Sequence, residues 1–513
     1  MNDCSIKTKR MSFSKLKFIK LLLLITFIQS AIAQKTGVFK GHSDVGEVLH
    51  KGSVRFDKHS GNYTVAASGS NIWFTHDEFH FVWRKMKGDF ILQARIQFIT
   101  AGQDPHRKLG LMVRSTLDSS SSSVNATIHG DGLTSLQYRK LSNTNIEEIK
   151  FDNKAPNIIQ LERKGNRYIM SVARFGDPYT TKEITGIDLG DEVYVGLFLC
   201  AHNKDVIEKA VFDNVRIIIP AKNGFVPYKD YIGSNIETFD LGSAKRTIVY
   251  TSSASLQAPN WTHSGKSLIY NSDGLIYKLK LSKKKGKQIP TGEVKNNNND
   301  HVLSFDGKMI GLSSSSADGK YNSVVYTMPL SGGAPKQITP VGPSYLHGWS
   351  PDGKYLIYTG QRNGEFDIYK MLANGGDEVR LTKAAGLDDG SEYSPDGKYI
   401  YFNSVRRGRM QIWRMDADGS NQVQITSDEY NNWFPHISPD GKWLLFLSFM
   451  GDVKADDHPF YKNVYLRLMP VINGTPKVVV YLYGGQGSIN TPSWSPDSKH
   501  FGFVSNSDLI IDK

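Results

Sequence analysis

The chain has 513 residues with a formal net charge of +12, and it is long enough to build two separate hydrophobic cores. Residues 1–33 hold six basic residues and one acid, so the remainder is near +7. That charge is mild for the length, and no Lys/Arg stripe interleaves with aromatic residues, which argues against nucleic-acid binding. The one basic run, Lys283–Lys287, is typical of a solvated hairpin tip.

Residues 1–33 are predicted to be a signal peptide. Six basic residues between Lys7 and Lys20 precede the apolar stretch Leu21–Ile28, and Ala31-Ile32-Ala33 forms a small-x-small cleavage site. The apolar stretch is too short to remain as a membrane span, and no Cys follows the cleavage site to carry a lipid anchor. We expect a protein that is cleaved after Ala33 and is either periplasmic or secreted, without a membrane span.

Cysteine usage predicts no disulfide framework and no Cys metal cluster. Cys4 leaves with the signal peptide, so Cys200 is alone. It ends the apolar run Val195–Cys200, a position typical of a buried, inert thiol.

Residues 36–219 are predicted to form a β-sandwich, because alternating strands recur there without a helical stretch. The phrases Gly88-Asp89-Phe90, Gly110–Arg114 and Phe212–Val215 resemble those of concanavalin A-like jelly-roll modules, which occur beside carbohydrate-active enzymes. Aromatic and polar side chains of the kind that hold sugars are present, but core or strand positions explain each of them as well. These side chains are Trp73, Trp83, His129, Gln137 and Tyr138.

After a linker at residues 220–235, residues 236–513 carry a repeat. Its clearest copy is Trp349-Ser350-Pro351-Asp352-Gly353-Lys354, and the steps between successive Ser/Thr residues are 42, 46, 44, 44 and 57. Pro-Asp-Gly makes a tight turn between two strands, two more strands follow, and a period of about 40–45 residues is typical of a propeller blade. The Ser/Thr of the six copies are Thr262, Ser304, Ser350, Ser394, Ser438 and Ser495.

The two ends of this region are predicted to share one blade. The last copy supplies only two strands, and the missing two are expected at 236–241 and 246–251. Such a closure leaves no long open edge. The Ser-Pro-Asp-Gly-Lys phrase, the Gly-Gly turn and the Leu-Thr ending of the blade resemble the WD-like repeats of TolB-type propellers. The expected fold is therefore all-β: a jelly-roll-like sandwich followed by a six-bladed β-propeller.

Residues two or three positions before the repeated Ser/Thr lead into the innermost strand, so we expect them at one mouth of the channel. His301, His347, Glu392 and His436 come from four consecutive blades at these positions. Imidazole and carboxylate suit a divalent transition metal, so one divalent metal ion is a candidate cofactor. The alternative is that each His satisfies a loop at a blade junction. Because side chains alternate along a strand, the register is expected to change between blades.

Further polar residues near these positions are candidate ligand contacts. Polar runs precede His301, Glu392 and His436, and an insertion at 456–461 lengthens the fifth blade. The candidate ligand-binding residues are Asp388, Asp389, Asn432, Gln486, Arg407 and Arg409.

Two functions fit this sequence. The resemblance to TolB-type proteins implies a module that binds a glycan or a protein partner at the channel mouth. The alternative is a metal-dependent lyase of acidic oligosaccharides, with His458 or Arg362 as the base and Arg407 or Arg409 holding the substrate carboxylate. A peptidase is disfavoured because no Gly-x-Ser-x-Gly elbow follows the propeller.

Overall fold

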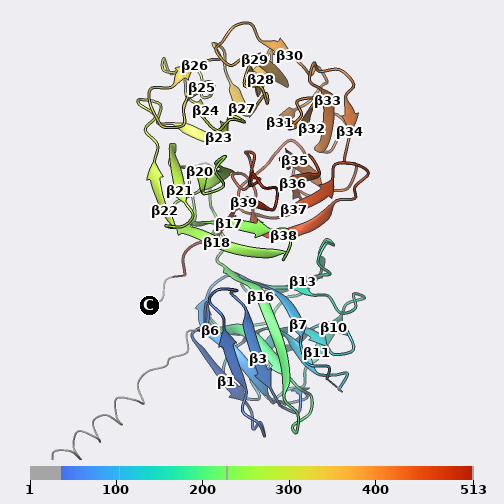
Figure 1. Ribbon diagram of the computed structural model, residues 1–513. Coiled ribbons are helices and arrows are strands. Elements are labelled where there is room, and N and C mark those ends of the chain that lie inside the picture. Colours follow the sequence, from blue (N-terminus) through green and yellow to red (C-terminus); the bar gives the residue numbers. More distant parts are fainter. Residues whose placement is uncertain (1–35, 103, 227–228, 511–513) are drawn as a thin grey trace, which may run out of the picture.

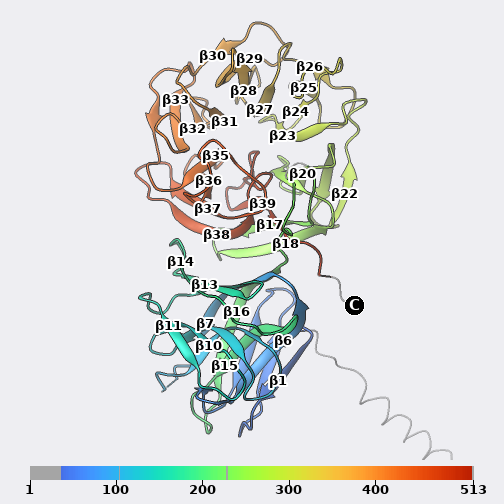
Figure 2. The same cartoon turned by 180° about the vertical axis from the view of Figure 1, so that it is seen from behind.

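The structure is a computed structural model that describes residues 36–102, 104–226 and 229–510. The predicted signal peptide lies outside the described residues. Within them the regular structure is all β, and no helix long and apolar enough to cross a membrane is present. Two bodies are visible, a sandwich and a propeller that sits with its rim against it (Figure 1). Figure 2 shows the same arrangement from behind.

The N-terminal body consists of two seven-stranded antiparallel sheets, as the alternating pattern predicts. One buried cluster, which includes Leu111, Val195, Leu92, Leu161 and Phe212, takes side chains from both sheets and forms the core between them. The first sheet has the order β1(Gly41–Val45), β6(Phe79–Lys87), β15(Glu192–Cys200), β8(Lys108–Arg114), β9(Ser123–His129), β10(Thr134–Arg139), β11(Glu147–Lys150). The second has the order β14(Thr180–Ile184), β13(Arg167–Ala173), β12(Ile158–Lys164), β7(Phe90–Phe98), β16(Glu208–Ile218), β3(Tyr63–Ala67), β2(Ser53–Phe56).

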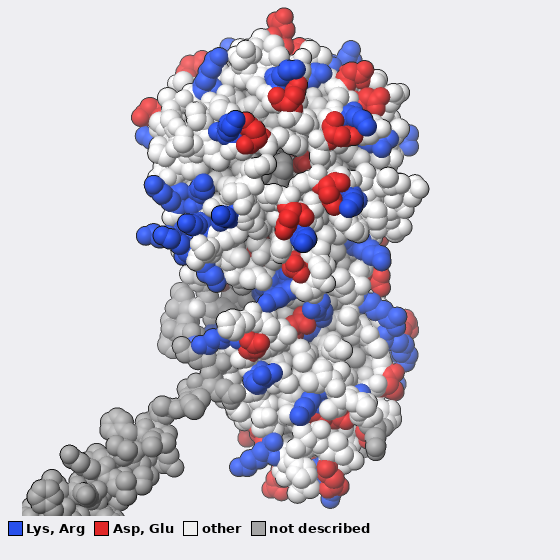
Figure 3. All heavy atoms as spheres, in the orientation of Figure 1, with Lys and Arg blue, Asp and Glu red and all other residues white. Residues whose placement is uncertain are grey.

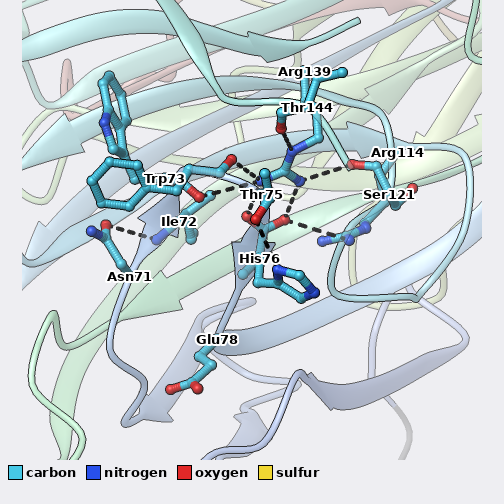
Figure 4. Close-up of polar contacts among 12 residues, drawn as sticks. Asn71, Ile72, Trp73, Thr75, His76, Glu78, Arg114, Ser121, Arg139 and Thr144 are labelled. Carbon is cyan, nitrogen blue, oxygen red and sulfur yellow. Dashed lines mark hydrogen bonds and ion pairs between the residues drawn. The ribbon is translucent and has the colours of Figure 1, made fainter. Parts of the chain in front are cut away.

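A small hairpin, β4(Ile72–Trp73) and β5(His76–Asp77), covers part of the outer face of the first sheet. Asp77 is fully buried and accepts hydrogen bonds of 2.8 and 2.7 Å from the Arg139 guanidinium, which also donates to the carbonyl of Phe74. Figure 4 shows Arg139 reaching this hairpin with Arg114 beside it. Cys200 is buried, as predicted, and burial raises the pKa of its thiol to about 11.

Residues 234–506 of the described chain form six blades around a centre. Five blades have four strands, and each is built from consecutive strands in chain order, innermost first. They are β19(Gln257–Trp261), β20(Ser267–Ser272), β21(Leu275–Lys280), β22(Lys285–Gln288); β23(Asn297–Leu303), β24(Met309–Ser314), β25(Val324–Pro329), β26(Lys336–Gln337); β27(Ser344–Trp349), β28(Tyr355–Arg362), β29(Glu365–Leu372), β30(Val379–Arg380); β31(Asp388–Tyr393), β32(Tyr399–Ser404), β33(Gln411–Asp416), β34(Val423–Gln424); β35(Asn431–Ile437), β36(Trp443–Phe449), β37(Lys462–Pro470), β38(Lys477–Gly484).

The sixth blade closes the ring as the repeat count predicts. It pairs β17(Ser234–Asp240) with both β18(Lys245–Ser252) and β39(His500–Asn506), so the two ends of the repeat region share one sheet. Phe239 and Phe501 stack across this junction with ring centroids 4.9 Å apart. Its innermost position is reduced to a single bridge between Trp494 and Phe501.

The repeated phrase is a hydrogen-bonded turn. In its clearest copy the Ser350 hydroxyl donates to Asp352 over 2.6 Å and accepts from the Tyr355 amide over 2.9 Å, while Gly353 takes the positive φ of 72° that the turn requires. The indole of Trp349 donates to the carbonyl of Val302 in the preceding blade. One phrase therefore both folds its own blade and ties it to its neighbour.

The sandwich and the propeller contact each other through a polar centre flanked by aromatic residues. Glu237 of β17 is fully buried and is held by Arg216 of the sandwich and Arg246 of β18 at 2.8 and 2.7 Å. Burial opposes ionisation, but the two guanidinium groups outweigh it and lower the pKa of Glu237 to about 2. Arg246 also donates to Gln93 of the sandwich, and the amide of Tyr179 donates to the hydroxyl of Tyr465.

Candidate functional site

Each innermost strand of the five four-stranded blades has a β-bulge at nearly the same place. The pairing register shifts between Gln257 and Asn260, Asn297 and His301, Leu346 and Gly348, Asp389 and Glu392, and Trp433 and His436. Ala258, Gly390 and Phe434 lie at equivalent positions in these bulges and have positive φ. A bulge re-aims the side chains on either side of it. The sequence led us to expect a register change between blades, whereas the structure has the change inside each of these five innermost strands.

The bulges divide the channel-lining residues between two cavities. A cavity of about 490 Å³ is lined by residues before or within the bulges, and a second of about 260 Å³ is lined by residues after them. We call them the main cavity and the rear cavity. The rear cavity is mostly apolar, with Trp261, Trp349 and Trp494 among its residues and Glu392 as its acidic residue.

The main cavity receives side chains from all six blades and from the insertion in the fifth. Its lining is rich in amides, carboxyls and aromatic rings. The lining residues are Tyr231, Ser255, Gln257, Asn271, Asp273, Gly274, Asn297, Asn298, Asn299, Asp300, Tyr345, His347, Thr359, Phe366, Leu387, Asp389, Phe434, Asp456, His458, Phe460, Gln486 and Asn490. A cavity of this size is large enough for a small molecule or for one or two residues of a peptide.

A carboxylate–imidazole pair lies in this cavity. Asp389 Oδ1 is 2.9 Å from Nε2 of His347 and accepts a 2.6 Å hydrogen bond from the hydroxyl of Thr359. Burial disfavours both charges, but their mutual attraction is stronger, so the pKa of Asp389 is lowered and that of His347 is raised.

Asp300 is a second buried carboxyl with a different environment. It is 6% exposed, and no hydrogen bond or ion pair is given to its carboxyl by the described residues. Burial, supported by the negative charge of Asp389, raises the pKa of Asp300 to about 7, although His347 opposes that rise. Two aspartates in one cavity thus have pKa values shifted in opposite directions, a pattern that recurs at functional sites.

The structure separates the four predicted metal ligands. His347 lies in the main cavity, whereas Glu392 lines the rear cavity and pairs with Nδ1 of His436 at 2.6 Å. His301 lines neither cavity, and burial lowers its pKa to about 4. The expectation that these residues face one space is wrong, because the bulges turn them in different directions. Among the described residues no group of three or more His, Cys, Asp or Glu side chains is arranged to hold a metal ion, and the metal stays a prediction.

Three of the other predicted residues, Asp389, Gln486 and His458, line the main cavity. His458 packs edge-on against Trp433, and burial lowers its pKa. The insertion that carries it reaches the same mouth, as the sequence predicts.

The remaining predicted residues support the blades instead. Arg362 pairs with Glu378 at 2.8 Å, and Asp388 accepts from Arg406 at 2.7 Å. Asn432 is fully buried and donates to Thr426, which follows the outermost strand of the preceding blade. Arg407 donates to Gln424 on the surface, and Arg409 donates to the carbonyl of Gly451. None of these five residues is among those that line the main cavity.

Sequence reasoning missed Tyr345, Thr359 and Phe366 and did not single out Asp300. Tyr345 lies two residues before His347 on the same strand, so strand alternation was a usable signal for it. Asp300 follows a run of four asparagines, and the run itself was the signal. Thr359 and Phe366 come from the second and third strands of their blade, and no sequence pattern pointed to either residue.

The sandwich residues considered for sugar binding are mainly internal. Gln137 is fully buried and its side-chain amide lies 3.2 Å from Nε2 of His129. Tyr138 is buried and donates to Glu147, and the half-buried Trp83 donates to Ser43. Figure 4 shows Trp73 at the hairpin beside Arg139. The lysines of the β21–β22 hairpin are exposed and gather at the edge of the propeller (Figure 3).

Comparisons with known proteins agree with the propeller. The sequence profile of the TolB beta propeller domain matches residues 341–456. An uncharacterized protein of Agrobacterium fabrum is 44% identical over 272 residues, which span 53% of this chain and 92% of that protein. The chain belongs to the TolB-like β-propeller family.

One solved structure of a TolB-like protein has the same propeller fold, and a second is a more distant match. A candidate TolB of Agrobacterium tumefaciens is 43% identical, with a TM-score of 0.52, and the match covers 55% of this chain and all of that one. TolB of Acinetobacter baumannii is 20% identical, with a TM-score of 0.40 and coverage of 50% and 64%. The first match leaves almost half of this TolB-like chain without a counterpart in that relative.

Proposed function

We propose that this TolB-like protein is an exported binding protein whose main cavity holds a glycan or a segment of a protein partner. The observation that supports this is the single cavity of about 490 Å³ to which all six blades contribute polar side chains. A propeller that served only as a scaffold has no need of the buried carboxyl of Asp300, which no described residue hydrogen-bonds, because such a group opposes folding. Export rests on the predicted signal peptide, and periplasmic and secreted locations are both consistent with it.

The lyase alternative receives no support from the cavity. A uronate substrate carries a carboxylate and requires a cation to hold it. The residues that line the main cavity include Asp273, Asp300, Asp389 and Asp456 and no Lys or Arg. Arg407 and Arg409, which were predicted to hold that carboxylate, have partners elsewhere.

Binding is tested with an array of short peptides and oligosaccharides. Gln257 lines the main cavity and its amide donates only to the neighbouring Ser255, so Gln257→Trp is expected to fill the cavity without breaking the blade. Gln288→Trp, on an exposed outer strand, is the control. We expect ligands that bind the mature protein to be lost with Gln257→Trp and kept with Gln288→Trp. An array on which the two variants and the parent behave alike would contradict the proposal.

A further inference from the structure

We propose that the main cavity recognises an organic cation, an ammonium or guanidinium group carried by the partner. This inference rests on the proposed function and names the chemical class of its ligand. It is independent of the predicted metal, because a single organic cation requires hydrogen-bond acceptors rather than a ligand cluster.

The charge of the lining is negative at depth. Four aspartates and no Lys or Arg line the cavity. Asp273 and Asp456 are exposed, and Asp456 pairs with Lys454, whereas the buried Asp389 pairs with His347. Asp300 is buried, with an exposed fraction of 6%, and no described side chain forms a hydrogen bond or ion pair with its carboxyl. A buried charge without a partner is costly, so the site is completed by a positive group that arrives from outside.

Two amide side chains on one wall of the cavity use their donors within the protein. Asn271 donates its side-chain NH2 group to the carbonyls of Asn297 and Asn298, each at 2.9 Å. Asn297 donates to the carbonyls of Gly274 and Val294, which leaves its own Oδ1 buried without a hydrogen bond. On this wall the unsatisfied capacity is therefore on oxygen. Ammonium and guanidinium groups are donors only, and they match it.

Aromatic side chains provide the rest of the surface. Tyr345, Phe366 and Phe434 line the cavity together with Tyr231 and Phe460, whose rings contact each other edge to face at 5.8 Å. Ring faces attract cations and also pack against the methylene groups that carry them. The lining therefore suits a lysine or arginine side chain, or an amino sugar, better than a bare ion.

The binding of four probes to the mature protein is measured by isothermal titration calorimetry. Tri-lysine and glucosamine oligosaccharide carry the cation on a peptide and on a sugar, and tri-glutamate and maltotriose are the acidic and neutral counterparts. We expect a cationic probe to bind at least tenfold more tightly than its counterpart, and the better of the two cations identifies the source. Binding of maltotriose or tri-glutamate alone would overturn the inference but keep the proposed function. Loss of all binding here and on the array would overturn both.

The decisive variant is Asp300→Asn, which keeps the shape of the side chain and removes its charge. We expect it to weaken cation binding at least tenfold, because it removes the charge that the donors of the cation would contact. Asp452→Asn, an exposed aspartate of the same propeller, is the control for net charge. Unchanged affinity in Asp300→Asn would overturn the inference.

A pH series on the unmodified protein needs no variant. The titratable groups around Asp300 are His347 and Tyr345 from β27, Asp389 from β31 and His458 from the insertion. Ionisation of Asp300 is required for cation binding, so affinity is expected to fall as the pH decreases from 8 to 6. Affinity that rises as the pH decreases from 8 to 6 would contradict the assignment of Asp300 as the group that binds the cation.

Discussion

At the scale of single residues, Asp300 and Asp389 respond oppositely to one cavity. Asp389 has an imidazolium and a hydroxyl as partners, and its pKa falls, whereas Asp300 has neither and its pKa rises to about 7. Both effects follow from burial, which penalises a charge unless a partner compensates it. The difference makes two separate predictions about stability and pH.

Asp300→Asn is expected to stabilise the protein at pH 8. The folded pKa of about 7 lies above the ordinary value of 3.8, so the carboxyl destabilises the fold increasingly as the pH rises from about 4 to 7. The gain in the free energy of unfolding should be on the order of 3 kcal/mol at pH 8 and should vanish at pH 4. Urea unfolding at the two pH values measures it, and a variant that is less stable at pH 8 would refute the prediction.

Asp389→Asn is expected to destabilise the protein by about 1–3 kcal/mol. The lowered pKa of Asp389 gives stability that is present above its ordinary value of 3.8. The raised pKa of His347 gives stability that is present below 6.5 and is lost as the pH rises through the folded pKa. The loss in the variant should therefore be largest between pH 4 and 6.5. Thr359→Val leaves the ion pair between Asp389 and His347 intact. The stability lost in this variant should therefore not become smaller above pH 6.5.

At the scale of elements, the bulged innermost strand decides which cavity a side chain enters. Gly390 sits in the bulge of β31 with φ of +61°, and a Cβ there would lie 2.3 Å from Oδ1 of Asn403. Ala258 and Phe434 hold a positive φ at the equivalent positions, so the glycine is required here mainly for the close approach of Asn403. Its replacement tests whether the bulge positions Asp389.

Gly390→Ala should destabilise the protein by about 2 kcal/mol or more and weaken ligand binding in the main cavity. Gly353→Ala is the matched control, because Gly353 also has a positive φ, of +72°, but its added Cβ meets nothing within 4 Å. It should cost about 1 kcal/mol and leave binding unchanged. Urea unfolding and calorimetry compare the two, and equal effects on binding would argue against a positioning role for the bulge.

At the scale of the whole molecule, the sandwich and the propeller are joined near the cavity. Phe460 and Tyr461 pack with Ile91 and Ile218 of the sandwich, while His458 of the same insertion lines the main cavity. The insertion therefore contacts both the second domain and the proposed ligand site.

Arg246→Met should separate the unfolding of the two domains. It leaves Glu237 buried beside Arg216 alone, and removal of one partner from a buried ion network costs about 3–5 kcal/mol. Differential scanning calorimetry should resolve two transitions where the parent protein has one. The control is Lys245→Met. This variant removes a neighbouring, more exposed cation, whose ammonium group donates to the carbonyl of His59. A single unshifted transition in Arg246→Met would contradict a coupled interface.

The sequence by itself determined the repeat count, the shared closing blade and the two-part all-β organisation. These follow from local rules, because Ser-Pro-Asp-Gly-Lys makes the same turn wherever it occurs and strand alternation is read directly from the chain. The repeat also brought Asp389, His347, Gln486 and His458 to one mouth. Only the tertiary structure decided that Glu392 and His436 face away from them. The register shift in each innermost strand arises from pairing with the next strand, which no local pattern records, and a shift of one residue reverses the face of every side chain beyond it.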